Sequence, residues 1–175
     1  MRKAPMHRET VYYDSREFPK WGRFYAAASE KGLCLIALPG GKAEAFLEKV
    51  IRRFSPHLLI QHSAFFADFF RQLGQYLQGS AVEWRCPLDL EGTPFQLQVW
   101  EAVKAIPYGE TRTYGEIARA LGRPGSARAV GRANHDNPLP IVIPCHRVIG
   151  AKGALVGFGG GLALKENLLN LERKK

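Results

Sequence analysis

Apolar positions in the first half of the chain follow first a strand-like and then a helix-like pattern. Two short apolar runs, 23–28 and 33–38, flank a polar segment that ends in glycine, which predicts a β-hairpin. Apolar residues then recur every three or four positions over 43–54 and 63–77, which predicts two helices with one buried face each. The run 81–88 predicts a further strand. We therefore expect a small α/β domain here.

The second half carries clearer signals for where helices begin. Two capping boxes, each a threonine followed three residues later by Gln or Glu, predict helices that start after Thr93 and Thr113. A turn closes on Ser126, which we expect to cap a third helix over 127–135. Two short helices joined by a glycine-containing turn form a helix-turn-helix pattern. A last helix is predicted over 162–175.

The apolar run 141–143 predicts a buried strand, and a reactive pair of residues follows it closely. Cys145 stands directly before His146, and Arg147 comes next. The thiolate is the reactive form of cysteine, so a neighbouring base or positive charge favours a nucleophilic role. The pair alone is also compatible with a hydrolase, a redox sensor or a metal site. A free cysteine at the end of a core strand is also often just a small apolar residue.

Basic residues exceed acidic ones, 25 against 16, which gives a formal charge of +9. An anionic partner is expected, and nucleic acid is the leading candidate. Between Arg112 and Lys152 only Glu116 and Asp136 are acidic. Within this stretch the predicted helix 127–135 consists largely of small residues and arginines. Small residues serve tight helix packing equally well, but the basic surplus favours contact with nucleic acid.

Several classes of function are disfavoured by what the sequence lacks. The three cysteines form no CxxC pair, and the five histidines show no ligand spacing with them, so we expect no metal site. The glycine-rich loop after residue 150 has no phosphate-binding motif, so we expect no nucleotide cofactor. No apolar run is long enough to span a bilayer. The odd number of cysteines and the start of the chain, residues 1–5, predict a reducing, intracellular compartment.

Taken in order, the motifs of residues 93–172 closely resemble the O6-alkylguanine-DNA alkyltransferases, also called methylated-DNA–protein-cysteine methyltransferases. The family implies an α/β fold with a small ribonuclease-H-like N-terminal domain over 1–90. It also implies a mainly α, winged-helix-like domain with the helix-turn-helix over 91–175. The first domain would be structural, and the second would bind DNA and transfer the alkyl group. The resemblance rests on the capped helix after Thr93, Tyr114-Gly115-Glu116, Arg128-Ala129-Val130-Gly131, Asn137-Pro138, Pro144-Cys145-His146-Arg147-Val148, Gly160-Gly161, Lys165 and Glu172.

This resemblance implies direct DNA repair. The helix-turn-helix would enter the minor groove of double-stranded DNA, and the alkylated guanine would rotate out of the stack. Its O6-alkyl group, or the O4-alkyl group of a thymine, would pass irreversibly to Cys145, so each molecule would act once. The protein would work as a monomer without a cofactor or metal. We expect a cytoplasmic, nucleoid-associated protein, or a nuclear one in a eukaryote.

The family also implies a role for each matching residue of the catalytic centre. His146 would deprotonate Cys145 through a water molecule, while Glu172 holds the imidazole. Asn137 would tie the recognition helix to the active-site strand. The thiolate is a strong, soft nucleophile, which suits displacement at an alkyl carbon.

Further residues are implied to contact the substrate. Arg128 would fill the space that the rotated base leaves, and Tyr114 would contact the rotated nucleotide. The guanine would also meet the carbonyl groups of Cys145 and Val148, the ring of Phe158 and the amide of Gly159. The implied DNA surface comprises Phe95, Tyr114, Gly115, Arg123, Ala127, Arg128, Ala129, Gly131, Arg132 and Ala151.

Phe158 departs from the family, which usually has a tyrosine here. Phenylalanine keeps an apolar wall but lacks the hydroxyl, so we expect transfer to persist, more slowly or with altered tolerance of bulky groups.

Three other functions compete with transfer. A non-enzymatic lesion-binding relative would lack Cys145. A Cys-His hydrolase would need an oxyanion site and an orienting group beyond Glu172, and a helix-turn-helix regulator would leave the apolar run before Cys145 unexplained.

Overall fold

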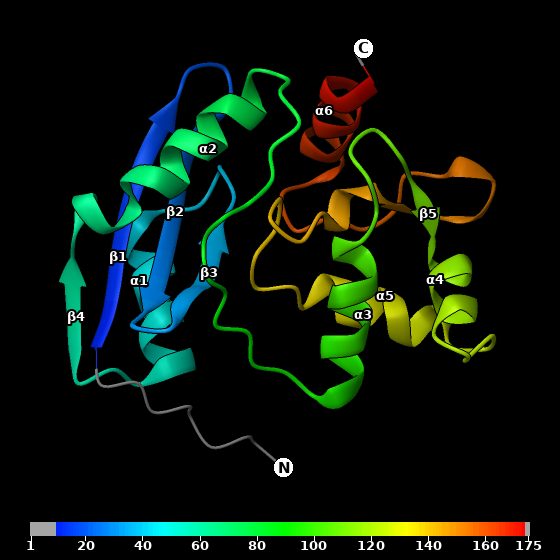
Figure 1. Ribbon diagram of the computed structural model, residues 1–175, viewed down its shortest axis with the longest axis horizontal. Helices are drawn as coiled ribbons and strands as arrows, with labels where there is room; N and C mark the ends of the chain where they lie inside the picture. The colour runs from blue at the N-terminus through cyan, green and yellow to red at the C-terminus, as the bar shows by residue number, and fades with distance from the viewer. Residues whose placement is uncertain (1–9, 174–175) are drawn as a thin grey trace. The chain divides into compact units, whose positions relative to one another are not determined.

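The computed structural model describes residues 10–173, which separate into two units. The first unit holds the described residues up to Tyr76 together with Val82–Asp89, and the second holds Leu77–Ala81 together with the described residues from Leu90 onward. The expectations for residues 1–5 and 174–175 lie outside the described residues. Figure 1 shows that the first unit combines a sheet with helices and that the second unit is mainly helical.

Four strands of the described chain form the sheet of the first unit. Their order is β3-β2-β1-β4, with β2 antiparallel to both of its neighbours and β4 parallel to β1. The predicted hairpin is confirmed as β2 and β3. Neither β1 nor β4 was predicted from the sequence, because buried and exposed side chains do not alternate along these strands. In β1 only Val11 and Asp14 are buried. The bounds are β1 (Thr10–Phe18), β2 (Gly22–Ser29), β3 (Gly32–Ala37) and β4 (Leu58–Gln61).

Two helices complete the first unit. Helix α1 (Ala43–Phe54) confirms the first predicted helix and buries three apolar residues in a core cluster with the sheet. The segment predicted as a second continuous helix is instead a 3-10 turn, Ser63–Phe66, followed by α2 (Ala67–Leu77). The side chain of His62 accepts a hydrogen bond from the amide of Phe65, which stabilises the tighter first turn.

The strand predicted over 81–88 is wrong. This segment follows α2 without regular secondary structure and pairs with the sheet through an isolated bridge between Leu33 and Leu88. The amide of Leu33 donates to the carbonyl of Pro87, and the amide of Asp89 donates to the carbonyl of Leu33. Pro87 has no amide hydrogen, so the pairing cannot extend through it as a regular ladder.

The described part of the second unit combines helices with one pair of short parallel strands. Both capping boxes form, at Thr93 and Thr113, and each starts the helix that it predicted. The mixed sheet of the first unit and the helical second unit confirm the predicted α/β class. The helices are α3 (Pro94–Lys104), α4 (Tyr114–Ala120), α5 (Ala127–His135) and α6 (Leu162–Arg173), and the strands are β5 (Arg112–Thr113) and β6 (Val148–Ile149).

Two local predictions in the second unit are wrong. The apolar run predicted as a strand is a buried loop, in which Ile141 has φ +76° and an isolated bridge joins Pro140 to Ile143. Pro140 directly before this run and Pro144 directly after it have no amide donors, so a regular ladder cannot form. Ser126 makes no capping bond through its side chain, and its backbone (φ −96°, ψ +20°) is not in the extended conformation typical of an N-cap.

Candidate active site

Cys145 begins a 3-10 turn, Cys145–Arg147, and is only 6% exposed. Its amide donates to the carbonyl of Ile143 over 2.7 Å. Asn137 supports the same loop: its Nδ2 donates to the Ile143 carbonyl over 2.8 Å, and its Oδ1 accepts from the amide of Leu139 over 2.9 Å. The bond to Oδ1 forms an Asx turn, which connects the end of α5 to the loop that carries the thiol.

The carboxylate of Glu172, on α6, is the centre of a buried polar network. Its Oε1 lies 2.8 Å from Nε2 of His146 and accepts from Nη2 of Arg147 over 3.0 Å. Its Oε2 accepts from Nε of Arg147 over 2.9 Å and from the amide of Gly109 over 3.0 Å. Nη1 of Arg147 donates to the carbonyl of Ile106 over 2.6 Å. The carboxylate therefore orients the imidazole and balances the charge of the buried guanidinium.

Burial sets the protonation of the two residues that begin the turn. Burial raises the pKa of the Cys145 thiol to about 11, while a hydrogen bond from Asn137 and the charge of Lys165 both act to lower it. Burial also lowers the pKa of His146, although the adjacent Glu172 carboxylate acts to raise it. At neutral pH the site therefore holds a neutral thiol next to a neutral imidazole, which can accept a proton.

Lys165 is a buried cation to which the sequence alone assigned no role. Its Nζ donates to the carbonyl of Val148 over 2.6 Å and to the carbonyl of Val156 over 2.8 Å. These bonds attach the loop between β6 and α6 to the site, and the positive charge favours the thiolate of Cys145. The sequence did indicate that Lys165 is buried, because it stands three residues before the buried Leu168, on the same face of the predicted helix.

Asn134, on the buried face of α5, links Cys145 to Tyr114. Its Nδ2 donates to the carbonyl of Cys145 over 3.4 Å. Burial raises the pKa of the Tyr114 hydroxyl, a hydrogen bond with Asn134 lowers it, and the charge of Cys145 raises it. Tyr114 therefore lies close to both residues. The sequence signal was a polar residue four positions after the buried Val130, on the same face of the helix.

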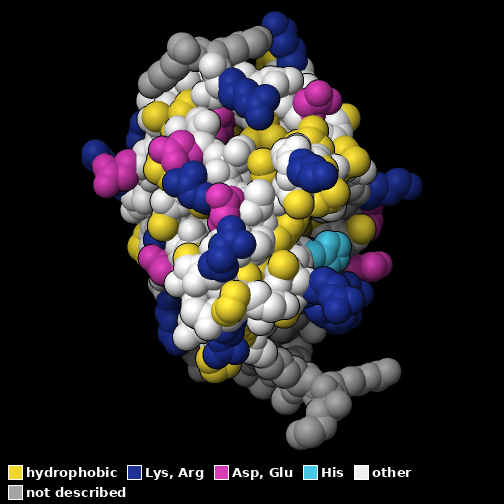
Figure 2. Space-filling model, turned by 90° about the vertical axis from the view of Figure 1, so that its right-hand side faces the viewer, with side chains coloured by type: hydrophobic (Ala, Val, Ile, Leu, Met, Phe, Trp, Pro, Cys, Tyr) yellow, Lys and Arg dark blue, Asp and Glu magenta, His cyan; other side chains and the backbone are white. Residues whose placement is uncertain are grey.

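A groove of about 710 Å³ lies beside Tyr114, with walls from α4, α5 and the turn after β6. The ring of Tyr114 lies 3.7 Å from where a Cβ at Gly131 would stand, so the two helices approach closely here. Figure 2 shows the side on which α4 lies in Figure 1, with dark blue Lys and Arg side chains spread around yellow apolar areas. Predicted DNA contacts that line the groove are Tyr114, Gly115, Ala127, Arg128, Gly131 and Ala151, and the other lining residues are Thr113, Glu116, Arg119 and Lys152.

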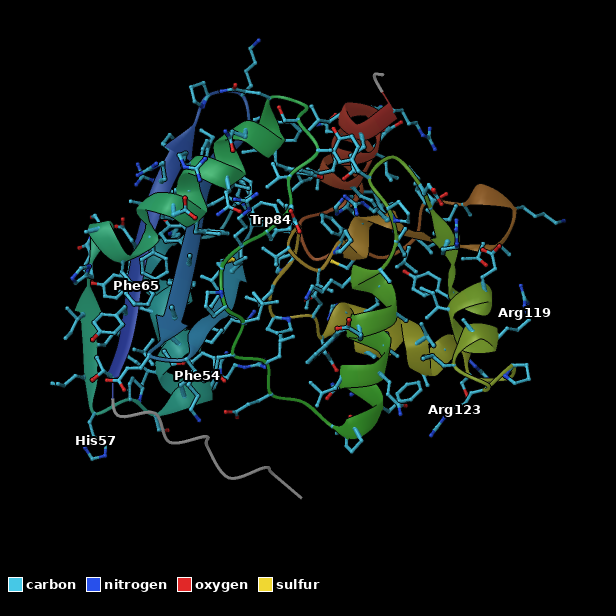
Figure 3. All side chains as sticks on the ribbon, viewed as in Figure 1. Phe54, His57, Phe65, Trp84, Arg119 and Arg123 are labelled. Atoms are coloured by element: carbon cyan, nitrogen blue, oxygen red, sulfur yellow. The ribbon has the colours of Figure 1, made fainter. Side chains whose placement is uncertain are left out.

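Four of the predicted DNA contacts are not part of the groove lining: Phe95, Arg123, Ala129 and Arg132. The guanidinium carbon of Arg123 lies 5.3 Å from the centroid of the Phe95 ring, a cation–π contact between the loop after α4 and the start of α3. Figure 3 labels Arg123 at this place. Ala129 and Arg132 are exposed on α5.

The remaining predicted guanine contacts surround the Cys145 turn in different ways. The carbonyl of Val148 accepts from Lys165, which leaves one lone pair of the oxygen for another donor. The ring of Phe158 meets the imidazole of His146 edge to face, with the centroids 6.4 Å apart. A Cβ at Gly159 would meet no heavy atom within 4 Å, so the backbone at this position borders open space. The structure therefore brings Val148 and Phe158 to the turn and places Gly159 on an open loop.

Among residues 10–173, no group of three or more His, Cys, Asp and Glu residues could hold a metal ion. No helix of the same range is both long and apolar enough to cross a membrane. None of the three cysteines of this range, Cys34, Cys86 and Cys145, forms a disulfide.

The Glu172 network predicts a large loss of stability for Glu172→Gln. The substitution removes the charge that balances Arg147 and brings an amide donor up against N–H groups that need an acceptor. We expect the free energy of unfolding to fall by about 3–5 kcal/mol, measured by urea denaturation. Glu166→Gln, at an exposed position of α6, is the control and should change it by less than about 0.5 kcal/mol. Similar effects of the two substitutions would contradict the role of the network.

The raised pKa of Cys145 predicts how it reacts with a small reagent in the absence of DNA. Because only the thiolate reacts, the rate of modification by iodoacetamide should rise about tenfold per pH unit between roughly pH 7.5 and 9.5. Peptide mapping separates Cys145 from Cys34 and Cys86. In the unfolded chain the rate should level off above the ordinary pKa of 9.0. A native rate that levels off at that same pH would show that burial does not raise the pKa.

Comparison with known proteins covers both units. Residues 11–90 match the family model described as the 6-O-methylguanine DNA methyltransferase ribonuclease-like domain, and residues 94–174 match the model of its DNA binding domain. The methylated-DNA–protein-cysteine methyltransferase of Mycolicibacterium paratuberculosis is 59% identical over 109 residues, which are 62% of this chain and 66% of that protein. The protein of the same name from Methanosarcina acetivorans is 44% identical over 162 residues, which are 93% of this chain and 98% of that protein.

Solved structures agree with this assignment. A crystal structure of the Mycobacterium tuberculosis protein OGT in complex with DNA matches with a TM-score of 0.79 and 40% sequence identity. The match covers 93% of this chain and 92% of that chain. Sequence and structure together show that the chain is a DNA-repair methyltransferase and belongs to the 6-O-methylguanine DNA methyltransferase family.

Proposed function

We propose that the chain repairs O6-alkylguanine in double-stranded DNA by moving the alkyl group irreversibly to Cys145, once per molecule. The observation that carries this proposal is the buried arrangement of Cys145, His146 and Glu172 close to a groove lined by α5. The related Mycobacterium tuberculosis structure contains DNA, and a net charge of +9 suits a polyanionic partner. The same route would remove the O4-alkyl group of thymine.

The helix pair α4 and α5 supports a specific way of binding DNA. Helix α5 would lie in the minor groove, where its small residues allow close approach and Arg128 enters the space left by the rotated base. The base would pass Tyr114 on its way to Cys145, because Tyr114 lines the groove and lies close to Cys145. The remaining contacts with the duplex would come from Phe95, Gly115, Arg123, Ala127, Ala129, Gly131, Arg132 and Ala151.

The transfer forms a bond between Sγ of Cys145 and the alkyl carbon, and it breaks the bond between that carbon and O6 of guanine. His146 would accept the thiol proton through a bridging water, and Glu172 keeps its ring in one orientation. The electron pair of the broken bond stays on guanine, which takes up a proton that balances the one lost from the thiol, so the overall reaction restores guanine in the DNA and leaves a thioether at Cys145. Reversal would require a nucleophile to displace the Cys145 thiolate from the alkyl carbon of a neutral thioether, which no ordinary base on the protein can do.

The guanine would be held mainly by backbone groups. The carbonyls of Cys145 and Val148 would accept from its amino group, and the amide of Gly159 would donate to O6. Phe158 would form an apolar wall next to His146, without the hydroxyl that the family usually has there. Asn137 would keep the thiol loop in register with α5.

The organisation of the chain is part of the proposal. Residues 1–90 would have a structural role, and residues 91–175 would bind DNA and carry out the transfer. The protein would act as a monomer, without metal or cofactor, in the cytoplasm at the nucleoid, or in the nucleus of a eukaryote.

Methyl transfer is expected to add about 14 Da to the peptide that contains Cys145, after incubation with a duplex carrying O6-methylguanine. Cys145→Ala should abolish the transfer and leave DNA binding in place, because the thiol supplies the nucleophile and not the binding surface. Cys34→Ala is the control, since Cys34 lies in the core cluster of the first unit. Mass added at another residue, or none at all, would refute the proposal.

A further inference from the structure

Two cations of the groove have no part in the mechanism above. Arg119, on α4, and Lys152, in the turn after β6, line the groove together with Tyr114 and Arg128. Both are exposed, and Arg119 stands three residues after Glu116 on α4, where its charge also acts on that carboxylate. We propose that Arg119 and Lys152 hold the phosphate backbone of bound DNA from these two elements of the groove. This rests on the proposed function, which makes DNA the occupant.

Lys152 has a backbone conformation that is unfavourable for lysine. Its φ is +58°, Gly153 has φ +81°, and the amide of Ala154 donates to the carbonyl of Ala151 over 3.3 Å. Two successive residues with positive φ are typical of a type I′ turn, which favours Asn, Asp or Gly at the first of them. A lysine in this left-handed backbone conformation costs about 1 kcal/mol of conformational free energy. The requirements of the turn therefore do not explain why a lysine stands at this position. What the lysine adds is an amine beside the groove.

Arg119 lies along the same groove from the side of α4. Its Nη1 is 3.6 Å from where a Cβ at Gly115 would stand, so the guanidinium folds back over the first turn of the helix. Figure 3 labels Arg119 on the outer side of α4. A guanidinium offers several N–H donors in one plane, which matches the oxygens of a phosphate, and an ammonium acts there as a point charge.

The charges around the groove favour an anion. Arg119, Arg128 and Lys152 are the cations of the described lining, and Glu116 is its one carboxylate. Glu116 accepts from the amide of Thr113 over 2.6 Å and from its hydroxyl over 2.8 Å, and the bond from the amide is the main reason that its pKa is lowered. Its carboxylate is therefore committed to the start of α4, and the groove keeps a net positive charge.

Phosphate contacts have a distinct thermodynamic signature. They release counterions from DNA, so each contact adds about 0.9 to the slope of log K against log salt concentration. They carry no sequence information, so they strengthen binding to damaged and undamaged DNA equally. Contacts with the rotated base would instead favour the damaged duplex.

The test measures binding of a duplex with O6-methylguanine, and of the same duplex with guanine, over a range of salt concentrations. The Cys145→Ala background prevents transfer during the measurement. Arg119→Ala and Lys152→Gly should each reduce the slope by about 0.9, and the double variant by about 1.8, with both duplexes. Lys152→Gly is chosen because glycine adopts a positive φ without strain, so the turn is preserved.

Matched controls separate this effect from general loss of charge. Lys104→Ala and Arg173→Ala remove exposed cations outside the groove lining and should leave the slope unchanged, while Lys152→Arg should keep it. Slopes for Arg119→Ala and Lys152→Gly equal to that of the parent would overturn the inference. The two substitutions could reduce the slope as expected with both duplexes while the natural chain, with Cys145 intact, transfers no methyl group. In that case the proposed function fails and the phosphate contacts remain.

Discussion

The buried carboxylate of Glu172 holds the active-site turn in place, and the geometry around the thiol depends on it. It joins His146 and Arg147 of the turn to the amide of Gly109, which lies far away in the sequence. Such a buried pair adds little net stability, because removing two charges from water costs nearly as much as their attraction returns. The loss of one partner is costly, since it leaves the other charge unbalanced. The network therefore penalises any arrangement that separates these groups.

The second unit keeps its reactive atom buried and its binding surface open. Burial raises the pKa of Cys145, so the resting thiol is protected from chance electrophiles, while Lys165 and Asn137 favour the thiolate when a proton acceptor is available. The groove beside Tyr114 is basic, and it is lined by a helix with small residues. Asn134 connects the two regions by a bond to the carbonyl of Cys145.

The helices could be predicted from the sequence because their signals are local. The boxes at Thr93 and Thr113 satisfy their own amide groups, whatever the rest of the chain does. The apolar runs 81–88 and 141–143 failed as strands, because an apolar run indicates burial and does not specify a ladder, and prolines remove the donors that a ladder needs. In the site, the adjacent Cys145 and His146 are visible in the sequence. Lys165 was part of the family resemblance without an assigned role, and Asn134 was not singled out, because both bind backbone carbonyls of other segments, which the sequence does not identify.

The most direct test of the account counts alkyl groups per molecule. With an excess of duplex carrying O6-methylguanine, transfer should stop once each chain has taken up one methyl group, because the thioether at Cys145 is not reversed by His146 or any ordinary base. Transfer that continues beyond one methyl group per chain would contradict the account, since it would show that the thiol is regenerated, as in a hydrolase.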